Sequence, residues 1–99
     1  MKQPIGIFDS GIGGLTVMKE IINLMPNEDI FYFGDTARVP YGNKSPKTIQ
    51  KFSMQIANFL LKKNIKILII ACNTATSFSL KILTNNLDIP VIGVIEPGA

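Results

Sequence analysis

The sequence predicts an α/β fold in which an open parallel sheet is flanked by helices, in the order β-α-β-α-β-α-β. Four short apolar runs, at residues 4–8, 30–33, 65–70 and 91–95, have the length and composition of strands. Segments of helical period separate them. The runs "IKILII" and "VIGVI" are almost continuously β-branched or leucine, which is typical of strands covered on both faces. Right-handed crossovers are expected between the strands.

The three intervening segments differ in how clearly they predict helices. In the first, Leu15, Met18, Ile22 and Met25 recur at spacings of three and four, and Pro26 ends the pattern. The second opens with Ser45-Pro46, a cap residue followed by a proline suited to the first helical position. Its expected apolar face consists of Ile49, Phe52, Ile56, Phe59 and Leu60. The third, from about residue 74 to 86, is shorter and less regular.

Composition limits the classes of function. The 99 residues, 46% of them hydrophobic, suffice for one domain or part of one. No apolar run approaches the roughly 20 residues of a membrane span, and the N-terminus lacks the order of a signal peptide. A single cysteine fits a reducing compartment. We therefore expect a soluble cytoplasmic protein with no membrane partner.

Charge and the missing histidine exclude further classes. The net charge of +3 comes from lysines spread along the chain, without interleaved aromatic residues, so we expect no nucleic-acid partner. The absence of histidine excludes histidine-based acid–base catalysis and most zinc sites within these residues, and we expect no metal. The remaining proton-transfer candidates are Cys72, Asp9, Asp35, Glu96, Tyr32 and Tyr41.

Polar residues follow each predicted strand, and these ends should meet at one edge of the sheet. They are Asp9-Ser10-Gly11, Gly34-Asp35-Thr36, Cys72-Asn73-Thr74 and Glu96-Pro97. A lone cysteine is often a small buried hydrophobe, but a thiol between a strand and a helix start lies near unpaired N–H groups. Asn73 and Thr74 serve equally as helix-start residues or as ligands of a carboxylate, and Ser10 allows the same two interpretations.

Two further stretches allow alternative interpretations. "DSGIGG", residues 9–14, resembles a phosphate loop, and Asp35 lies 22 residues beyond Gly13. Thr16 replaces the third small residue of a dinucleotide-binding motif, however, and Asp9 places a negative charge near the phosphates. A Rossmann-type nucleotide-binding module remains the alternative. In the long connection at residues 35–45, Arg38 either binds an anion or pairs with Asp35, and we favour the pairing.

Four stretches together resemble the N-terminal part of the glutamate racemase family. They are "IGIFDSGIGGLTV" (5–17), "YFGDTARVPYGNKS" (32–45), "ACNTAT" (71–76) and "PVIGVIEPGA" (90–99). The resemblance implies cofactor-independent interconversion of L- and D-glutamate, which supplies D-glutamate for peptidoglycan. It implies that Cys72 is one of two cysteines that exchange protons with the substrate Cα, and that Asp9 assists this thiol. The positions implied to hold the amino acid are Asp9, Ser10, Tyr41, Gly42, Asn73 and Thr74.

The resemblance also implies a larger enzyme. This chain contains one cysteine, whereas inversion by two thiols needs a second, which the family carries in another domain. We therefore expect residues 1–99 to form part of the N-terminal α/β domain of a two-domain, pseudo-symmetric enzyme, and to be inactive alone. The complete enzyme is expected to be a homodimer.

Overall fold

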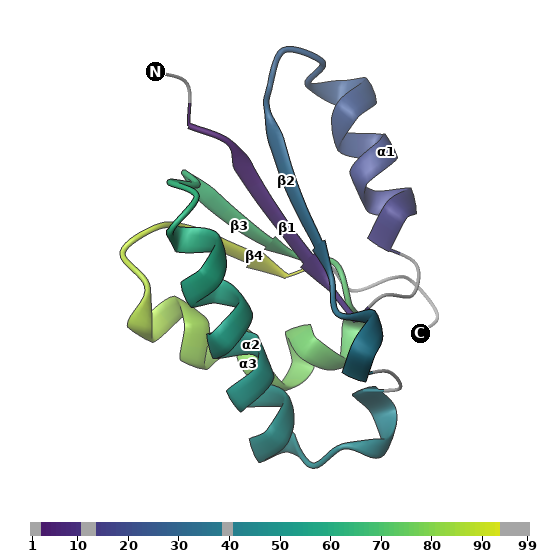
Figure 1. Ribbon diagram of the computed structural model, residues 1–99, viewed down its shortest axis with the longest axis vertical. Helices are drawn as coiled ribbons and strands as arrows, with labels where there is room; N and C mark the ends of the chain where they lie inside the picture. The colour runs from purple at the N-terminus through teal and green to yellow at the C-terminus, as the bar shows by residue number, and fades with distance from the viewer. Residues whose placement is uncertain (1–2, 11–13, 39–40, 94–99) are drawn as a thin grey trace.

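A four-stranded, fully parallel sheet forms the centre of the chain, with strand order β2-β1-β3-β4 (Figure 1). The computed structural model describes residues 3–10, 14–38 and 41–93. The strands are β1 (Ile5–Asp9), β2 (Ile30–Gly34), β3 (Ile67–Ile70) and β4 (Val91–Gly93). The α-helices are α1 (Gly14–Leu24), α2 (Pro46–Leu61) and α3 (Asn73–Asn86), and two 3-10 helices, η1 (Thr36–Arg38) and η2 (Tyr41–Asn43), follow β2. The predicted fold class and element order are confirmed.

The helices lie in two layers around the sheet (Figure 1). Helix α1 covers one face, and α2 and α3 pack side by side on the other. The change of face follows from right-handed crossovers, because β2 lies on one side of β1 while β3 and β4 lie on the other. All strand carboxyl ends therefore point to one edge, where α1, η1 and α3 begin (Figure 1).

Local sequence explains where α2 begins. Ser45 has an extended backbone, and its Oγ accepts a hydrogen bond from the Thr48 backbone N–H at 3.2 Å. Pro46 occupies the first helical turn, where its missing N–H costs nothing. The predicted cap is thus confirmed.

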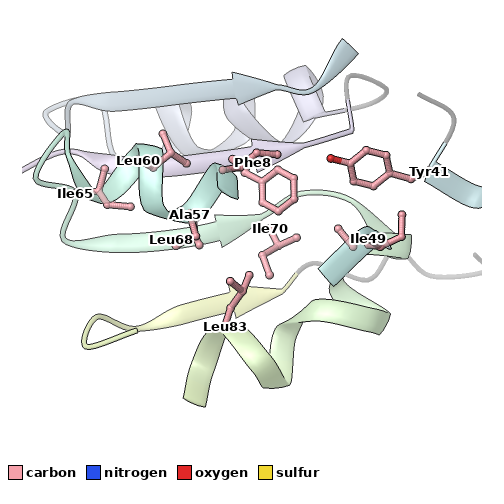
Figure 2. Packing of buried hydrophobic residues seen from close by; sticks show 11 residues of the cluster. Phe8, Tyr41, Ile49, Ala57, Leu60, Ile65, Leu68, Ile70 and Leu83 are labelled. Atoms are coloured by element: carbon pink, nitrogen blue, oxygen red, sulfur yellow. The ribbon is translucent and has the colours of Figure 1, made fainter. Parts of the chain in front are cut away.

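The larger core lies between the sheet and the α2/α3 layer (Figure 2). Phe8 of β1 and Leu68 and Ile70 of β3 are fully buried there, against Leu60 of α2 and Leu83 of α3. Phe59, expected on the buried face of α2, is instead 44% exposed. It lies beside the edge strand β2, where its ring meets Phe33 edge-on at 5.6 Å.

The predicted buried face of α1 is partly wrong. Ile21 is buried and packs with Val17 and Met18 against the sheet, whereas Ile22 and Met25 are 44% and 42% exposed. The reason is that α1 covers only part of its face of the sheet. Beside it remains an apolar hollow of about 440 Å³, which Met25 lines together with isoleucines of β1, β3 and β4.

Some expectations fall outside the described residues, namely those on Gly11, Gly13, Val39, Pro40, Glu96 and Pro97. Among the helices that are described, none is long and apolar enough to cross a membrane.

Candidate active site at the carboxyl edge of the sheet

Three strand ends converge where the sequence places the candidate residues. Asp9, the last residue of β1, pairs in register with Gly34 of β2, and the Asp35 N–H donates to the Asp9 carbonyl oxygen at 3.0 Å. On the other side of β1, the Ala71 N–H donates to the Phe8 carbonyl oxygen at 2.8 Å. Main-chain hydrogen bonds thus hold the segments that carry Asp9, Asp35 and Cys72 side by side, as predicted.

Cys72 lies at the junction between β3 and α3. It is the N-cap residue of α3, with extended backbone angles (φ −134°, ψ 125°), and its carbonyl oxygen accepts the Thr76 N–H at 2.9 Å. The side chain makes no capping hydrogen bond and is partly exposed. Asn73 and Thr74 form the first turn of α3 and are also partly exposed. The thiol therefore stands at the positive end of a 14-residue helix, within reach of a ligand.

A buried tyrosine–carboxylate pair lies on the same side of the sheet as Cys72. The Tyr41 hydroxyl donates to Oδ2 of Asp35 at 2.5 Å, and both residues are buried. Arg38 Nε lies 3.6 Å from the same oxygen, which confirms the predicted pairing. The guanidinium also donates to Gln55 and stacks on the Phe52 ring, 4.2 Å from its centroid.

This pair determines what residues 41 and 42 can offer a ligand. The Tyr41 phenol points into the core (Figure 2) and its hydroxyl is buried and bonded to Asp35, so this hydroxyl is not open to a ligand. Gly42 is exposed, with nothing within 4 Å of the position that a Cβ would occupy. If this turn binds a ligand as expected, its main chain makes the contact.

A second tyrosine–carboxylate pair lies on the α1 face. The Tyr32 hydroxyl donates to Oδ2 of Asp9 at 2.7 Å, and Asp9 is fully buried. Ser10, the next residue, is 6% exposed. Because side chains alternate along a strand, Asp9 belongs to the face of Ile5 and Ile7. Cys72 packs against the core on the other face, so the two expected catalytic groups approach the edge from opposite faces.

In both pairs the pKa of the tyrosine is raised. Burial raises the pKa of Tyr41, and the hydrogen bond to Asp35 and the charge of Asp35 raise it further, against a smaller opposing effect of Arg38. Burial, then the hydrogen bond and charge of Asp9, raise the pKa of Tyr32. The folded chain retains these protons above about pH 10, where an unfolded tyrosine loses its own. Stability from both pairs is therefore complete below about pH 10 and falls as pH rises further.

An alkaline titration of the chain tests this prediction. The chain has two tyrosines, so the Tyr32→Phe and Tyr41→Phe variants each report on one phenol. Phenolate absorbance should rise only together with loss of the far-ultraviolet circular dichroism of the fold. A rise between about pH 10 and 11 in a still folded chain would show that a hydroxyl is not held as described.

Comparison with known proteins gives the chain its family. No family model matches it. The curated glutamate racemase of Geobacter metallireducens is 63% identical over 97 residues, which cover 98% of this chain and 36% of that protein. The crystal structure of the Thermus thermophilus glutamate racemase, in complex with β-chloro-D-alanine, superposes with a TM-score of 0.91 at 53% identity. The match covers 97% of this chain and 38% of that one. The chain belongs to the glutamate racemase family.

A second solved member of the family supports the same assignment. The glutamate racemase of Francisella tularensis, in complex with D-glutamate, has a TM-score of 0.87 and 54% identity, over 93% of this chain and 35% of that one. The chain thus spans little more than a third of the length of the family members it matches. None of these matches favours the nucleotide-binding alternative.

From the sequence alone, Tyr32 was expected only as a possible proton-transfer group, and its pairing with Asp9 was not predicted. The pairing could have been found from the alternation of side chains along β2, which puts Ile30, Tyr32 and Gly34 on one face. With the register Ile7 to Tyr32 known, the same alternation in β1 puts Asp9 on that face two residues further on.

Proposed function

We propose that this chain supplies one half of the active site of a cofactor-independent glutamate racemase, with Cys72 as one of its two proton-transfer thiols. The observation that carries the proposal is the position of Cys72. The thiol is partly exposed at the start of α3, on the edge where the strands end, in a chain that belongs to the glutamate racemase family.

Inversion at Cα requires a proton-transfer group on each face of the substrate, and a thiol at this position can serve as one of them. The Cα proton of glutamate is very weakly acidic beside the carboxylate, so a preorganised site with little water must stabilise the carbanion. In the proposed reaction one thiolate takes the proton from Cα and the opposite thiol delivers one to the other face. The two cysteines exchange protonation states, and no redox change occurs.

The residues around Cys72 suit the binding of the substrate. The first N–H groups of α3 and the side chains of Asn73 and Thr74 offer donors to a carboxylate, which the helix dipole also attracts. Asp9, Ser10 and the main chain of Tyr41-Gly42 form the rest of the proposed binding edge. The D-glutamate complex of the F. tularensis relative supports an amino-acid dicarboxylate as the ligand.

Wider assignments follow from the family and belong to the same proposal. We place the second thiol in the part of the family fold that this chain does not span. The product D-glutamate is assigned to peptidoglycan synthesis in the cytoplasm, and the complete enzyme is proposed to act as a homodimer. Residues 1–99 alone are expected to be inactive.

A chimera tests the proposal directly. Residues of this chain replace the matching segment of the G. metallireducens racemase, and the unmodified relative is the positive control. The chimera should interconvert L- and D-glutamate, as followed by chiral chromatography, and the isolated 99-residue chain should not. A folded chimera without this activity would contradict the proposal, and so would an isolated chain that is more active than its Cys72→Ala variant.

A further inference from the structure

We infer that Tyr32 is a positioning residue for Asp9, which orients this carboxylate for its part in proton transfer without itself contacting the substrate. The inference rests on the proposed racemase function. It starts from the hydrogen bond of 2.7 Å between the Tyr32 hydroxyl and Asp9 Oδ2, which joins β2 to the last residue of β1.

The hydrogen bond joins two residues that are diagonal neighbours on adjacent strands, on one face of the sheet. Tyr32 pairs in register with Ile7, whereas Asp9 pairs with Gly34, so the phenol leans two residues along the strands to reach the carboxylate. Diagonal neighbours of this kind lie about 7–8 Å apart at the backbone, a distance that long aromatic side chains can bridge. Shorter side chains at position 32 would not reach Asp9.

Gly34 leaves the space that the Tyr32 ring occupies when it reaches Asp9. A Cβ at position 34 would lie 3.3 Å from both Cε1 and the hydroxyl oxygen of Tyr32, and 3.5 Å from Asp9 Oδ1. The first two contacts are tighter than ordinary van der Waals contact, so the ring would have to move. A glycine at this strand end thus allows the phenol to lie over the backbone against Asp9.

The chemistry of the pair fits a positioning role. Asp9 is fully buried, and a buried carboxylate requires donors to hold it in one orientation. The Tyr32 hydroxyl is a lasting donor, because burial and the adjacent carboxylate both oppose loss of its proton. The hydrogen bond engages Oδ2 and so restricts rotation of the carboxylate at the strand end.

The experiment compares kcat and KM of the chimera with those of its Tyr32→Phe variant. Removing the hydroxyl should lower kcat about tenfold and change KM by less than about twofold, because the substrate contacts remain. Gly34→Ala, which retains the hydroxyl but displaces the Tyr32 ring, should likewise lower kcat and leave KM nearly unchanged. Phe31→Ala, on the same strand but the opposite face, is the matched control and should leave kcat unchanged.

A double-mutant comparison separates positioning from general structural damage. In the Asp9→Asn background, Tyr32→Phe should lower kcat by less than about twofold further, because the carboxylate through which it acts is gone. An equal tenfold loss in both backgrounds, or a Tyr32→Phe variant with the kcat of the wild-type chimera, would overturn the inference. An inactive wild-type chimera would instead refute the proposed function, and the inference with it.

Discussion

Replacing Cys72 by serine in the chimera should lower kcat by about a thousandfold in both directions of glutamate interconversion. A serine hydroxyl occupies nearly the same volume at the start of α3, but it is a far weaker acid than a thiol and does not supply an anionic base at neutral pH. KM should change little, because Asn73, Thr74 and the helix N–H groups remain in place. Steady-state kinetics with each enantiomer measure both effects.

The matched control for this variant lies on the same helix. Ser77→Ala alters an exposed hydroxyl of α3 away from its first residue, and its kcat should equal that of the wild-type chimera. If Cys72→Ser retained more than about a tenth of the wild-type kcat, Cys72 would not be a proton-transfer group.

Replacing Phe8 by alanine should give the largest loss of folding stability. Phe8 is fully buried at the centre of the larger core, where β1 contacts β3 and the α2/α3 layer (Figure 2). Deleting its ring removes buried apolar surface and leaves a cavity, at a cost of about 3–5 kcal/mol. Because a small domain has a total stability of only about 5–15 kcal/mol, the variant should be marginally folded or unfolded. Urea unfolding of the 99-residue chain measures the difference.

Phe31→Ala is the matched control for Phe8→Ala. Phe31 lies on the edge strand β2, is 41% exposed, and has Lys63 Nζ 5.6 Å from its ring centroid. Its loss should cost about 1 kcal/mol or less. Equal losses for the two variants would show that Phe8 is not at the centre of the core.

The fold was predictable because continuous apolar runs and segments of helical period alternate along the chain. The continuous apolar runs marked strands, and the spacing of Ile49, Ile56 and Leu60 marked the buried face of α2. The buried face of α1 was not fully predictable. A periodic pattern shows that a helix has an apolar face, but not how much of the sheet that helix covers. Ile22 and Met25 are therefore apolar and yet exposed.

The candidate site was predictable in its positions but not in its contacts. Parallel strands bring their carboxyl ends to one edge, so Asp9, Asp35 and Cys72 could be placed together from the sequence. Whether a side chain points to that edge depends on register and on which face of the sheet it occupies. Register decides that Tyr32 reaches Asp9, whereas the place of η2 beyond the end of β2 decides that Tyr41 turns inward to Asp35.

Exchange of the Cα hydrogen in deuterated water tests the role of Cys72 most directly. The wild-type chimera should incorporate deuterium at Cα while it interconverts both enantiomers of glutamate. With Cys72→Ser, interconversion should slow by about a thousandfold and deuterium should enter one enantiomer only, through the remaining base. A Cys72→Ser chimera that exchanges and interconverts both enantiomers at the wild-type rate would contradict the assignment of Cys72.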